Sequence, residues 1–401
     1  MTSRRADEPS GGFATAMGRS GVREAGRSAG RRLVIGPRAL FLDEDVIPLA
    51  WRFWDSVSNK RAFLARGLAA VGATRAFEAA REAGGRAVVV LTYHRIAEPG
   101  ASNPYYDPVV SATPEGFRAQ MEMVRQRFQV VGPEDLIESG GSDRRPRAVV
   151  TFDDGYRDNH DVALPILQEL GVPAAFFIPT DFLERPRLPW WDHVAYAVKS
   201  TSRARFAVER TPEDATPIAI EPGVDRPKAL MTLIRAVLDG QVPDQDWFLG
   251  RLEERAEVEV DSRTLGRGLF LSWEHLAKIA DLGHAIGSHS HRHVPLGTLD
   301  DRTSRRDLAL SRTILEAALK RPVRTIAYPY GWPGAVDDRT YRLAADAGYR
   351  AGFTAIEGIA RPDAPDFNPL AIRRLTVGGG DTPALLRTRA ALWGALGRSW
   401  L

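Results

Sequence analysis

The stretch Ala148-Val149-Val150-Thr151-Phe152-Asp153-Asp154-Gly155-Tyr156 places two adjacent carboxylates at the end of an apolar run. The β-branched first half predicts a buried strand, and Gly155 then allows the chain to turn. Neighbouring strand residues point to opposite faces, but at a strand end that runs into a turn both carboxylates can reach one site. Adjacent carboxylates repel each other unless a cation or a shared proton relieves them. The pair therefore indicates a site with a cationic partner.

A second stretch, Gly287-Ser288-His289-Ser290-His291-Arg292-His293-Val294-Pro295, holds three of the chain's eight histidines within five positions. Neutral imidazole and carboxylate suit divalent metals such as zinc, and two His with one carboxylate leave coordination room for water. On a helical turn, His289 and His293 would point the same way. In an extended segment all three imidazoles would share one face, so His291 also stays a candidate ligand.

The alternation of strand-like and helix-like segments along the chain predicts its fold. From Val88-Val89-Val90-Leu91 onward, strand-like and helix-like segments alternate, and both motifs follow apolar runs. Parallel barrels build their sites at the carboxyl ends of the strands, so we predict a distorted or incomplete (β/α) barrel of about seven parallel strands. The expected parts are a disordered tail (1–35), an N-terminal helical extension (36–86), the barrel (87–380) with an insertion between the metal-ligand strands (184–268), and a C-terminal helix (381–401).

Both motifs resemble those of the polysaccharide deacetylases, the carbohydrate esterase family that shares the nodulation-protein-B homology domain. The family's Thr-Phe-Asp-Asp-Gly motif stands at 151–155, its His-Ser/Thr-x-x-His motif at 289–293, and its Arg-x-Pro-Tyr/Phe-Gly motif, in part, at 327–331. The resemblance spans residues 87 to 380 and is specific because the first two motifs occur in this order.

The resemblance implies a divalent metal, Zn²⁺ before Co²⁺, Ni²⁺ or Fe²⁺, held by Asp154, His289 and His293. It also implies that Asp153 is the general base and that the backbone N–H of Tyr330 contacts the oxyanion. In this arrangement His291 would be a spare.

Two departures from the family pattern concern the catalytic residues. Ala327 stands where the family has the Arg that holds the base carboxylate, and Arg373 and Arg374 are candidates to replace it. Alternation along a strand turns one of the two inward, and we assign the role to Arg374. The family's late general acid is missing, since no His follows His293. Permuted subgroups carry the acid on an early strand, and His94 at the end of the first apolar strand resembles that arrangement.

The implied function is a metal-dependent hydrolase that removes N-acetyl groups from an amino-sugar-containing oligo- or polysaccharide. Trp190 and Trp191 could stack on apolar sugar faces or pack in the core, whereas Trp273 is expected in the core. Two alternatives fit the same residues: a related amidohydrolase acting on a cyclic or other small amide, and a non-catalytic metal-containing carbohydrate-binding protein. The sequence names neither the polymer nor the oligomeric state.

Composition excludes other classes of protein. Contents of 44% hydrophobic and 26% charged residues are ordinary for a soluble globular chain. A net charge of only +3, without clustered aromatic and basic residues, argues against nucleic-acid binding. The chain has no cysteine for disulfides or thiolate ligands, and no apolar segment long enough for a membrane span. The N-terminus lacks the apolar core of a secretory signal, so we expect a cytoplasmic protein, or a periplasmic or secreted one if the start site is misassigned.

Overall fold

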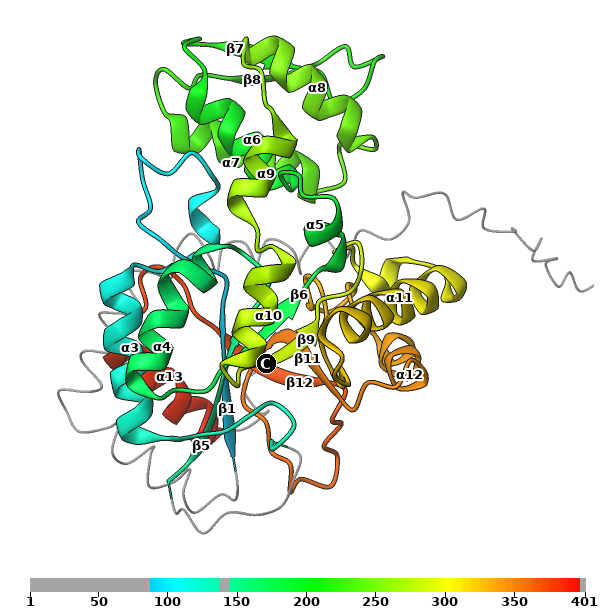
Figure 1. Ribbon diagram of the computed structural model, residues 1–401. Helices are drawn as coiled ribbons and strands as arrows, with labels where there is room; N and C mark the ends of the chain where they lie inside the picture. Colours follow the sequence, from blue (N-terminus) through cyan, green and yellow to red (C-terminus); the bar gives the residue numbers. More distant parts are fainter. Residues whose placement is uncertain (1–86, 137–144, 397–401) are drawn as a thin grey trace, which may run out of the picture. The chain divides into compact units, whose positions relative to one another are not determined.

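The fold is a closed parallel barrel. The computed structural model describes residues 87–136 and 145–396; the expected tail (1–35) and helical extension (36–86) lie outside these ranges. Seven strands follow each other in the order β1-β12-β11-β10-β9-β6-β5, and β5 pairs back onto β1 (Figure 1). Their bounds are β1 Val88–Tyr93, β5 Arg147–Phe152, β6 Ala175–Ile178, β9 Ala285–Ser288, β10 Thr325–Ala327, β11 Ala351–Glu357 and β12 Ile372–Thr376. The predicted barrel of about seven parallel strands is confirmed.

The strand register decides which residues meet at the carboxyl rim. β1 and β5 run in register up to Tyr93 and Phe152, and the backbone N–H of Asp153 donates to the Tyr93 carbonyl at 2.9 Å. His94 directly follows Tyr93 at the end of β1, so it lies beside Asp153. The rim of a parallel barrel is where its loops and functional side chains gather.

An apolar layer fills the barrel below this rim. The rings of Phe177 and Phe353 lie with their centroids 5.3 Å apart, and Val90 and Val149 belong to the same buried cluster. A Cβ on Gly287 would lie 2.4 Å from the Phe177 ring, so only glycine lets β9 approach that side chain. Because the interior is packed, the rim is the end of the barrel at which a substrate can bind.

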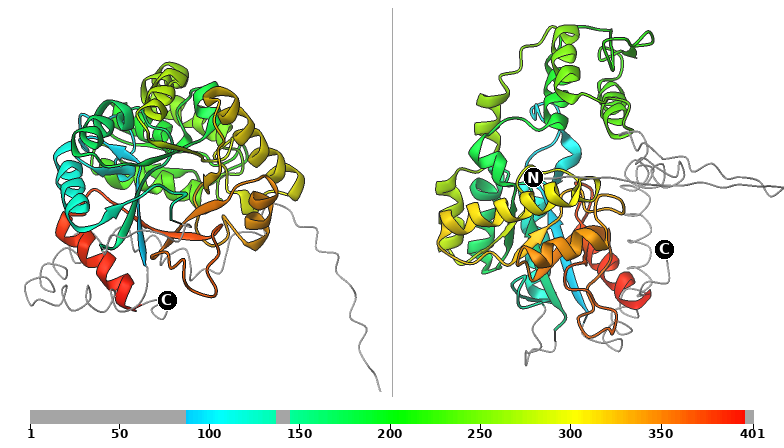
Figure 2. Two further views of the ribbon diagram at one scale, coloured as in Figure 1. Left: turned by 60° about the horizontal axis from the view of Figure 1, so that its bottom comes forward. Right: turned by 90° about the vertical axis from the view of Figure 1, so that its right-hand side faces the viewer.

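Helices cover the outside of the barrel (Figure 2, left). They are α3 Pro114–Arg127, α4 Leu164–Leu170, α10 Trp273–Asp281, α11 Asp301–Leu319, α12 Asp338–Asp346 and α13 Pro383–Leu396. Side-chain caps fix the starts of α3 and α10: the Thr113 hydroxyl accepts from the N–H of Gly116 at 3.1 Å, and Ser272 forms a capping box with His275. Within the described ranges, no helix combines the length and apolar character that a bilayer crossing requires.

Short elements complete the barrel. They are the paired strands β2 Arg95–Ile96 and β3 Val110–Ala112, the strand β4 Gln129–Val130 beside β5, the 3₁₀ turns η2 Asp107–Val109 and η4 Leu296–Thr298, and the π-helical turn η3 Asn159–Ala163.

Between β6 and β9 the chain forms a group of helices of its own. The elements are α5 Thr180–Glu184, α6 Trp190–Ser200, β7 Phe206–Val208, β8 Ile218–Ile220, α7 Arg226–Leu238, α8 Gln245–Ala256 and α9 Ser262–Leu269. β7 and β8 pair antiparallel, and α6 packs on α7 and α8 (Figure 1). The ammonium of Lys199 in α6 donates to the carbonyls of Asn103 and Tyr105 and to Asp107, and so ties the β2–β3 loop to these helices.

Candidate metal centre

Three predicted ligands converge at the rim. The Oδ1 atom of Asp154 lies 3.3 Å from Nε2 of His289 and 3.0 Å from Nε2 of His293, and all three residues are buried. Their ligand atoms lie within 4.8 Å of one another. We call these residues the triad. One anionic oxygen facing two imidazole nitrogens is a donor set that suits zinc and related divalent metals.

The orientation of His289 is set by a backbone group. Its Nδ1 lies 2.7 Å from the carbonyl oxygen of Ala327. β9 pairs with β10 at Ser288 and Ile326, so the residues that follow, His289 and Ala327, are neighbours. A carbonyl can only accept, so Nδ1 carries the proton and the Nε2 lone pair is left toward Asp154. This tautomer is the one that binds a metal through Nε2.

Helix α11 holds the histidine loop from behind. Asp307 is buried, its Oδ1 accepts from the N–H of His291 at 2.7 Å, and its Oδ2 accepts from Nε of Arg292 at 2.9 Å. The N–H of His293 donates to the Ser290 hydroxyl at 3.1 Å. The result is a tight loop, neither the helical turn nor the extended strand considered from the sequence.

His291 points away from the triad. Its Nδ1 lies 2.8 Å from the Thr180 hydroxyl, and its Nε2 lies 3.9 Å from Asp181. An extended segment would have put all three imidazoles on one face, and the tight loop instead separates this one. His291 is therefore not among the converging ligands.

Unusual backbone geometry collects around the triad. Six non-glycine residues of the described chain have positive φ, and four of them lie in these loops: Asp154 (71°), Ser290 (62°), His293 (54°) and Tyr330 (62°). Side chains other than glycine rarely adopt such angles, which cost about 1 kcal/mol or more and persist where surrounding contacts enforce them, often at active sites. The loops are thus shaped for these side chains at the expense of local stability.

Arg374 reaches Asp153 from inside the barrel. Its Nη1 donates to Oδ1 at 2.9 Å and its Nη2 to Oδ2 at 2.7 Å, while Nε donates to the carbonyl of Thr354 at 2.7 Å. Arg374 is only 1% exposed. Arg373 turns the other way, and its Nη1 donates to the carbonyl of Glu357 at 3.3 Å. Of the two arginines considered from the sequence, Arg374 is the one that the structure brings to Asp153.

Both carboxylates are held in the ionised form. Burial raises the pKa of Asp153, but the Arg374 guanidinium and then His289 outweigh it and lower the pKa below its usual range. Burial also raises the pKa of Asp154, but the facing imidazoles of His293 and then His289 outweigh it and bring the pKa well below the usual value. His94 adds a smaller lowering effect on both carboxyl pKa values, so its imidazole lies near the pair.

His94 and Tyr330 complete the set of predicted residues. His94 is half-buried; its N–H donates to the Ser111 hydroxyl at 2.9 Å, and its carbonyl accepts from Asn159 at 2.6 Å. The Tyr330 ring lies 5.2 Å from that of His293, and burial raises the pKa of its phenol to about 12. Within the described residues, the backbone N–H of Tyr330 has no hydrogen-bond partner, so this donor is free for a ligand.

Aromatic side chains surround the triad. Trp191 is buried, donates from Nε1 to the hydroxyl of Tyr156 at 3.2 Å, and lies 5.5 Å from the His293 ring. Trp190 is half-buried, and Trp273 packs against the core as expected. Sequence reasoning missed Trp332, which is 45% exposed, although it directly follows the third motif.

A second group, His160, Asp161 and His275, also has ligand atoms within 4.8 Å of one another. Two contacts make it a poorer metal site. Asp161 is already paired with Arg157 at 2.9 Å, and Nδ1 of His275 accepts from the N–H of Ser272 at 3.2 Å. The neutral His275 therefore carries its proton on Nε2, which removes that nitrogen as a ligand.

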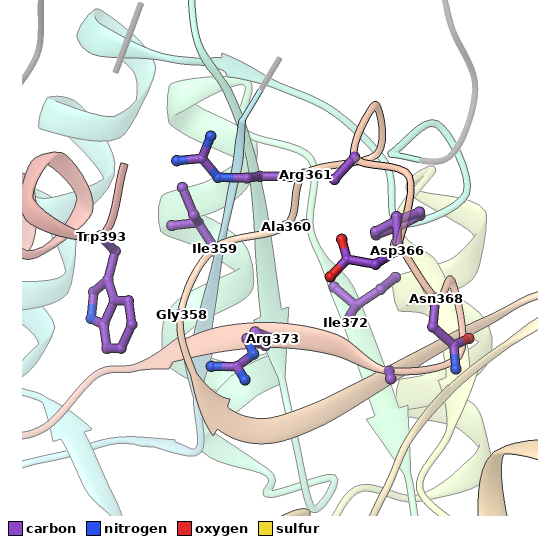
Figure 3. A pocket seen from close by; sticks show the side chains of 12 residues that line it. Gly358, Ile359, Ala360, Arg361, Asp366, Asn368, Ile372, Arg373 and Trp393 are labelled. Atoms are coloured by element: carbon purple, nitrogen blue, oxygen red, sulfur yellow. The ribbon is translucent and has the colours of Figure 1, made fainter. Parts of the chain in front are cut away.

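A pocket lies on the loop that follows β11, where Gly358, Arg373 and Trp393 line it (Figure 3). Its lining shares no residue with the triad. The charged residues Arg361, Asp366 and Arg373 each interact with other groups of the chain. Nothing in this pocket resembles the convergent donors of the rim.

A seven-stranded (β/α) barrel with an Asp-His-His triad at its carboxyl rim is a candidate metal centre of the kind that metal-dependent hydrolases use. A family model described as polysaccharide deacetylase matches residues 140–216 and 231–352. These ranges hold the triad, Asp153 and Tyr330, whereas His94 and Arg374 lie outside them. The chain belongs to the polysaccharide deacetylase family. Membership supports deacetylation of an acetylated polysaccharide, and so a carbohydrate substrate.

Several solved structures are similar to this chain. Streptococcus pyogenes deacetylase PplD in complex with acetate is 18% identical, with 76% of this chain and 98% of that chain covered and a TM-score of 0.49. IcaB from Ammonifex degensii is 18% identical over 78% of this chain and 98% of that one, with a TM-score of 0.46. BC0361, a polysaccharide deacetylase from Bacillus cereus, is 18% identical over 76% of this chain and 69% of that one, with a TM-score of 0.47. No curated protein matches this chain.

Proposed function

We propose that this protein is a metal-dependent hydrolase that removes N-acetyl groups from an amino-sugar-containing oligo- or polysaccharide. One observation carries the proposal. Asp153, held ionised by two hydrogen bonds from Arg374, lies beside a triad whose nitrogens and oxygen converge. A base next to a metal centre is an arrangement that suits the hydrolysis of an acetyl group by water.

The donor set fits a divalent metal, and Zn²⁺ is the ion we propose. Asp154 would supply an anionic oxygen and His289 and His293 would each supply Nε2. The contact between Nδ1 of His289 and the Ala327 carbonyl supports this, because such a partner orients metal-binding imidazoles. When bound, the ion supplies positive charge that polarises the acetyl carbonyl and makes the attacking water more acidic.

The chain's own residues would divide the remaining work. Asp153 would take the proton of the attacking water, which its lowered pKa permits at neutral pH. The backbone N–H of Tyr330 would donate to the oxyanion, a contact commonly worth about 10²–10³ in rate. His94 would give a proton to the departing amine nitrogen, so that the C–N bond breaks with a neutral amine as leaving group.

Acetate and ammonia release test this function directly. The metal-loaded protein is incubated with N-acetylglucosamine oligomers, with acetylated polysaccharides and with a cyclic ureide. We expect acetate from the N-acetylated sugars and no ammonia. Asp153→Asn should retain the metal and lose acetate release. Undiminished turnover in Asp153→Asn, or ammonia without acetate, would contradict the proposal.

A further inference from the structure

Trp332 is an exposed tryptophan beside the triad. Among the described residues, the large hydrophobic side chains that are exposed are Val224, Leu282 and Trp332, and only the last is aromatic. Tryptophan is usually well buried because its ring offers so much apolar surface. A solvent-facing indole at the rim is therefore a candidate contact for a bound substrate.

Trp332 is one ring away from a triad imidazole. Its indole meets the Tyr330 ring edge-on, with centroids 5.0 Å apart and an angle of 65°. The Tyr330 ring in turn lies 5.2 Å from the ring of His293. On α6, Trp190 donates from Nε1 to the Tyr330 hydroxyl at 3.4 Å. Trp190, Tyr330 and Trp332 thus form an aromatic strip without a charged member.

The backbone holds Trp332 in place. Its carbonyl accepts from the N–H groups of Ala335 at 3.0 Å and Val336 at 3.3 Å. Gly331 has φ 59°, and a Cβ on it would lie 2.4 Å from the backbone nitrogen of Ala355, which donates to the Gly331 carbonyl at 2.9 Å. The loop is therefore fixed without a ligand, and little ordering is needed when one binds.

We propose that Trp332 is the platform for the sugar unit next to the one that loses its acetyl group, which makes the protein selective for oligomers of equatorially substituted amino sugars. The inference rests on the proposed function. Such sugars carry axial C–H groups on their faces, and these faces are apolar enough to stack on an indole. An uncharged strip suits this neutral face. Trp332 is thus a specificity-determining residue whose role does not include proton transfer.

Two substrates separate stacking from catalysis. We compare kcat/KM for acetate release from N-acetylglucosamine oligomers with kcat/KM for a small aryl acetate ester. Trp332→Ala should lower the oligomer value about tenfold more than the ester value, mainly through KM, as expected for loss of one aromatic contact. Trp332→Phe should restore part of the difference. Leu282→Ala, with a residue of 44% exposure just after α10, is the matched control and should leave both values unchanged.

Equal losses on both substrates, or no loss on the oligomer, would overturn the proposal. If no sugar yields acetate, the proposed hydrolysis fails, but the platform can still be measured. Binding of the same oligomers to the metal-loaded protein is then followed by titration calorimetry. Weaker binding in Trp332→Ala than in Leu282→Ala would uphold the platform, and equal binding in the two would overturn it.

Discussion

Arg374 and Asp153 share two buried hydrogen bonds, 2.9 and 2.7 Å long, across the width of one strand. Arg374 belongs to β12 and Asp153 follows β5, and β1 lies between these strands in the barrel. The planar guanidinium matches both carboxylate oxygens, which fixes the carboxylate plane as well as its charge. The pair therefore controls how the proposed base faces the triad.

We expect Arg374→Ala to move the acidic limb of the kcat/KM profile to higher pH. Burial alone raises the pKa of Asp153, and Arg374 is the largest effect that lowers it. Without Arg374 the carboxylate becomes protonated at a higher pH, so activity is lost earlier as the pH falls. The measurement is kcat/KM for acetate release against pH.

Two further variants serve as comparisons for Arg374→Ala. Arg374→Lys keeps the charge but lacks the planar fork that matches both carboxylate oxygens, so it should shift the limb less and lower the rate. Arg373→Ala, the neighbour that faces outward, should leave the limb in place. An acidic limb that stays put in Arg374→Ala would show that this arginine does not set the pKa of the base.

Sequence patterns predicted the strands and the residues at their ends, because apolar runs and turn residues are local signals. Alternation along β12 also predicted that one of two arginines would face inward, although periodicity alone could not choose Arg374. The orientation of His289 was beyond such reasoning, since it depends on a backbone carbonyl that only the pairing of β9 with β10 supplies. Likewise, the loop around His291 is shaped by Asp307, sixteen residues further along the chain.

Metal content should distinguish His289, which belongs to the triad, from the neighbouring His291, which does not. His289→Ala removes one of the three converging donors, so this variant should lose stoichiometric zinc. His291→Ala is the matched control, because its imidazole contacts the Thr180 hydroxyl and points away from the triad. Zinc is measured by elemental analysis after dialysis. Full zinc content in His289→Ala, or equal loss in both variants, would contradict the assignment of ligands.

Asp307 should matter for metal affinity although it touches none of the triad side chains. Asp307→Ala releases the N–H of His291 and the guanidinium of Arg292, and the loop that presents the triad imidazoles loses its support. We expect metal affinity to weaken about 10–100-fold, the usual effect of losing an outer partner. Competition with a chelator measures the affinity. Asp301→Ala, an exposed acidic position on the same helix, should bind zinc as the wild type does.

Asp192 should make the metal-free protein less stable as the pH rises. Its Oδ1 accepts from the N–H of Tyr106 at 2.8 Å, and its Oδ2 has no hydrogen-bond partner among the described residues. Burial raises its pKa to about 7, against ~3.9 in an unfolded chain. Between these values the folded state holds a proton that the unfolded state has lost, so the free energy of unfolding falls as the pH rises.

Asp192→Asn removes this titration. Between about pH 4 and pH 7, the variant should lose less stability than the wild type, by a difference on the order of 3 kcal/mol. Urea unfolding of the metal-free proteins across this range gives the two slopes. Parallel slopes would mean that Asp192 does not take up a proton on folding.

Substrates with different leaving groups test whether His94 donates a proton. An amine leaves as a neutral molecule only if it receives a proton, whereas a nitrophenolate leaves readily as an anion. His94→Gln should therefore lower acetate release from the N-acetylated sugar by about 10²–10⁴ and affect a nitrophenyl acetate far less. His160→Gln, a half-buried histidine outside the triad, serves as the control on both substrates. If His94→Gln slowed both reactions equally, the imidazole would be supporting the carboxylates rather than donating to the amine, because loss of the base or of the metal slows every substrate alike.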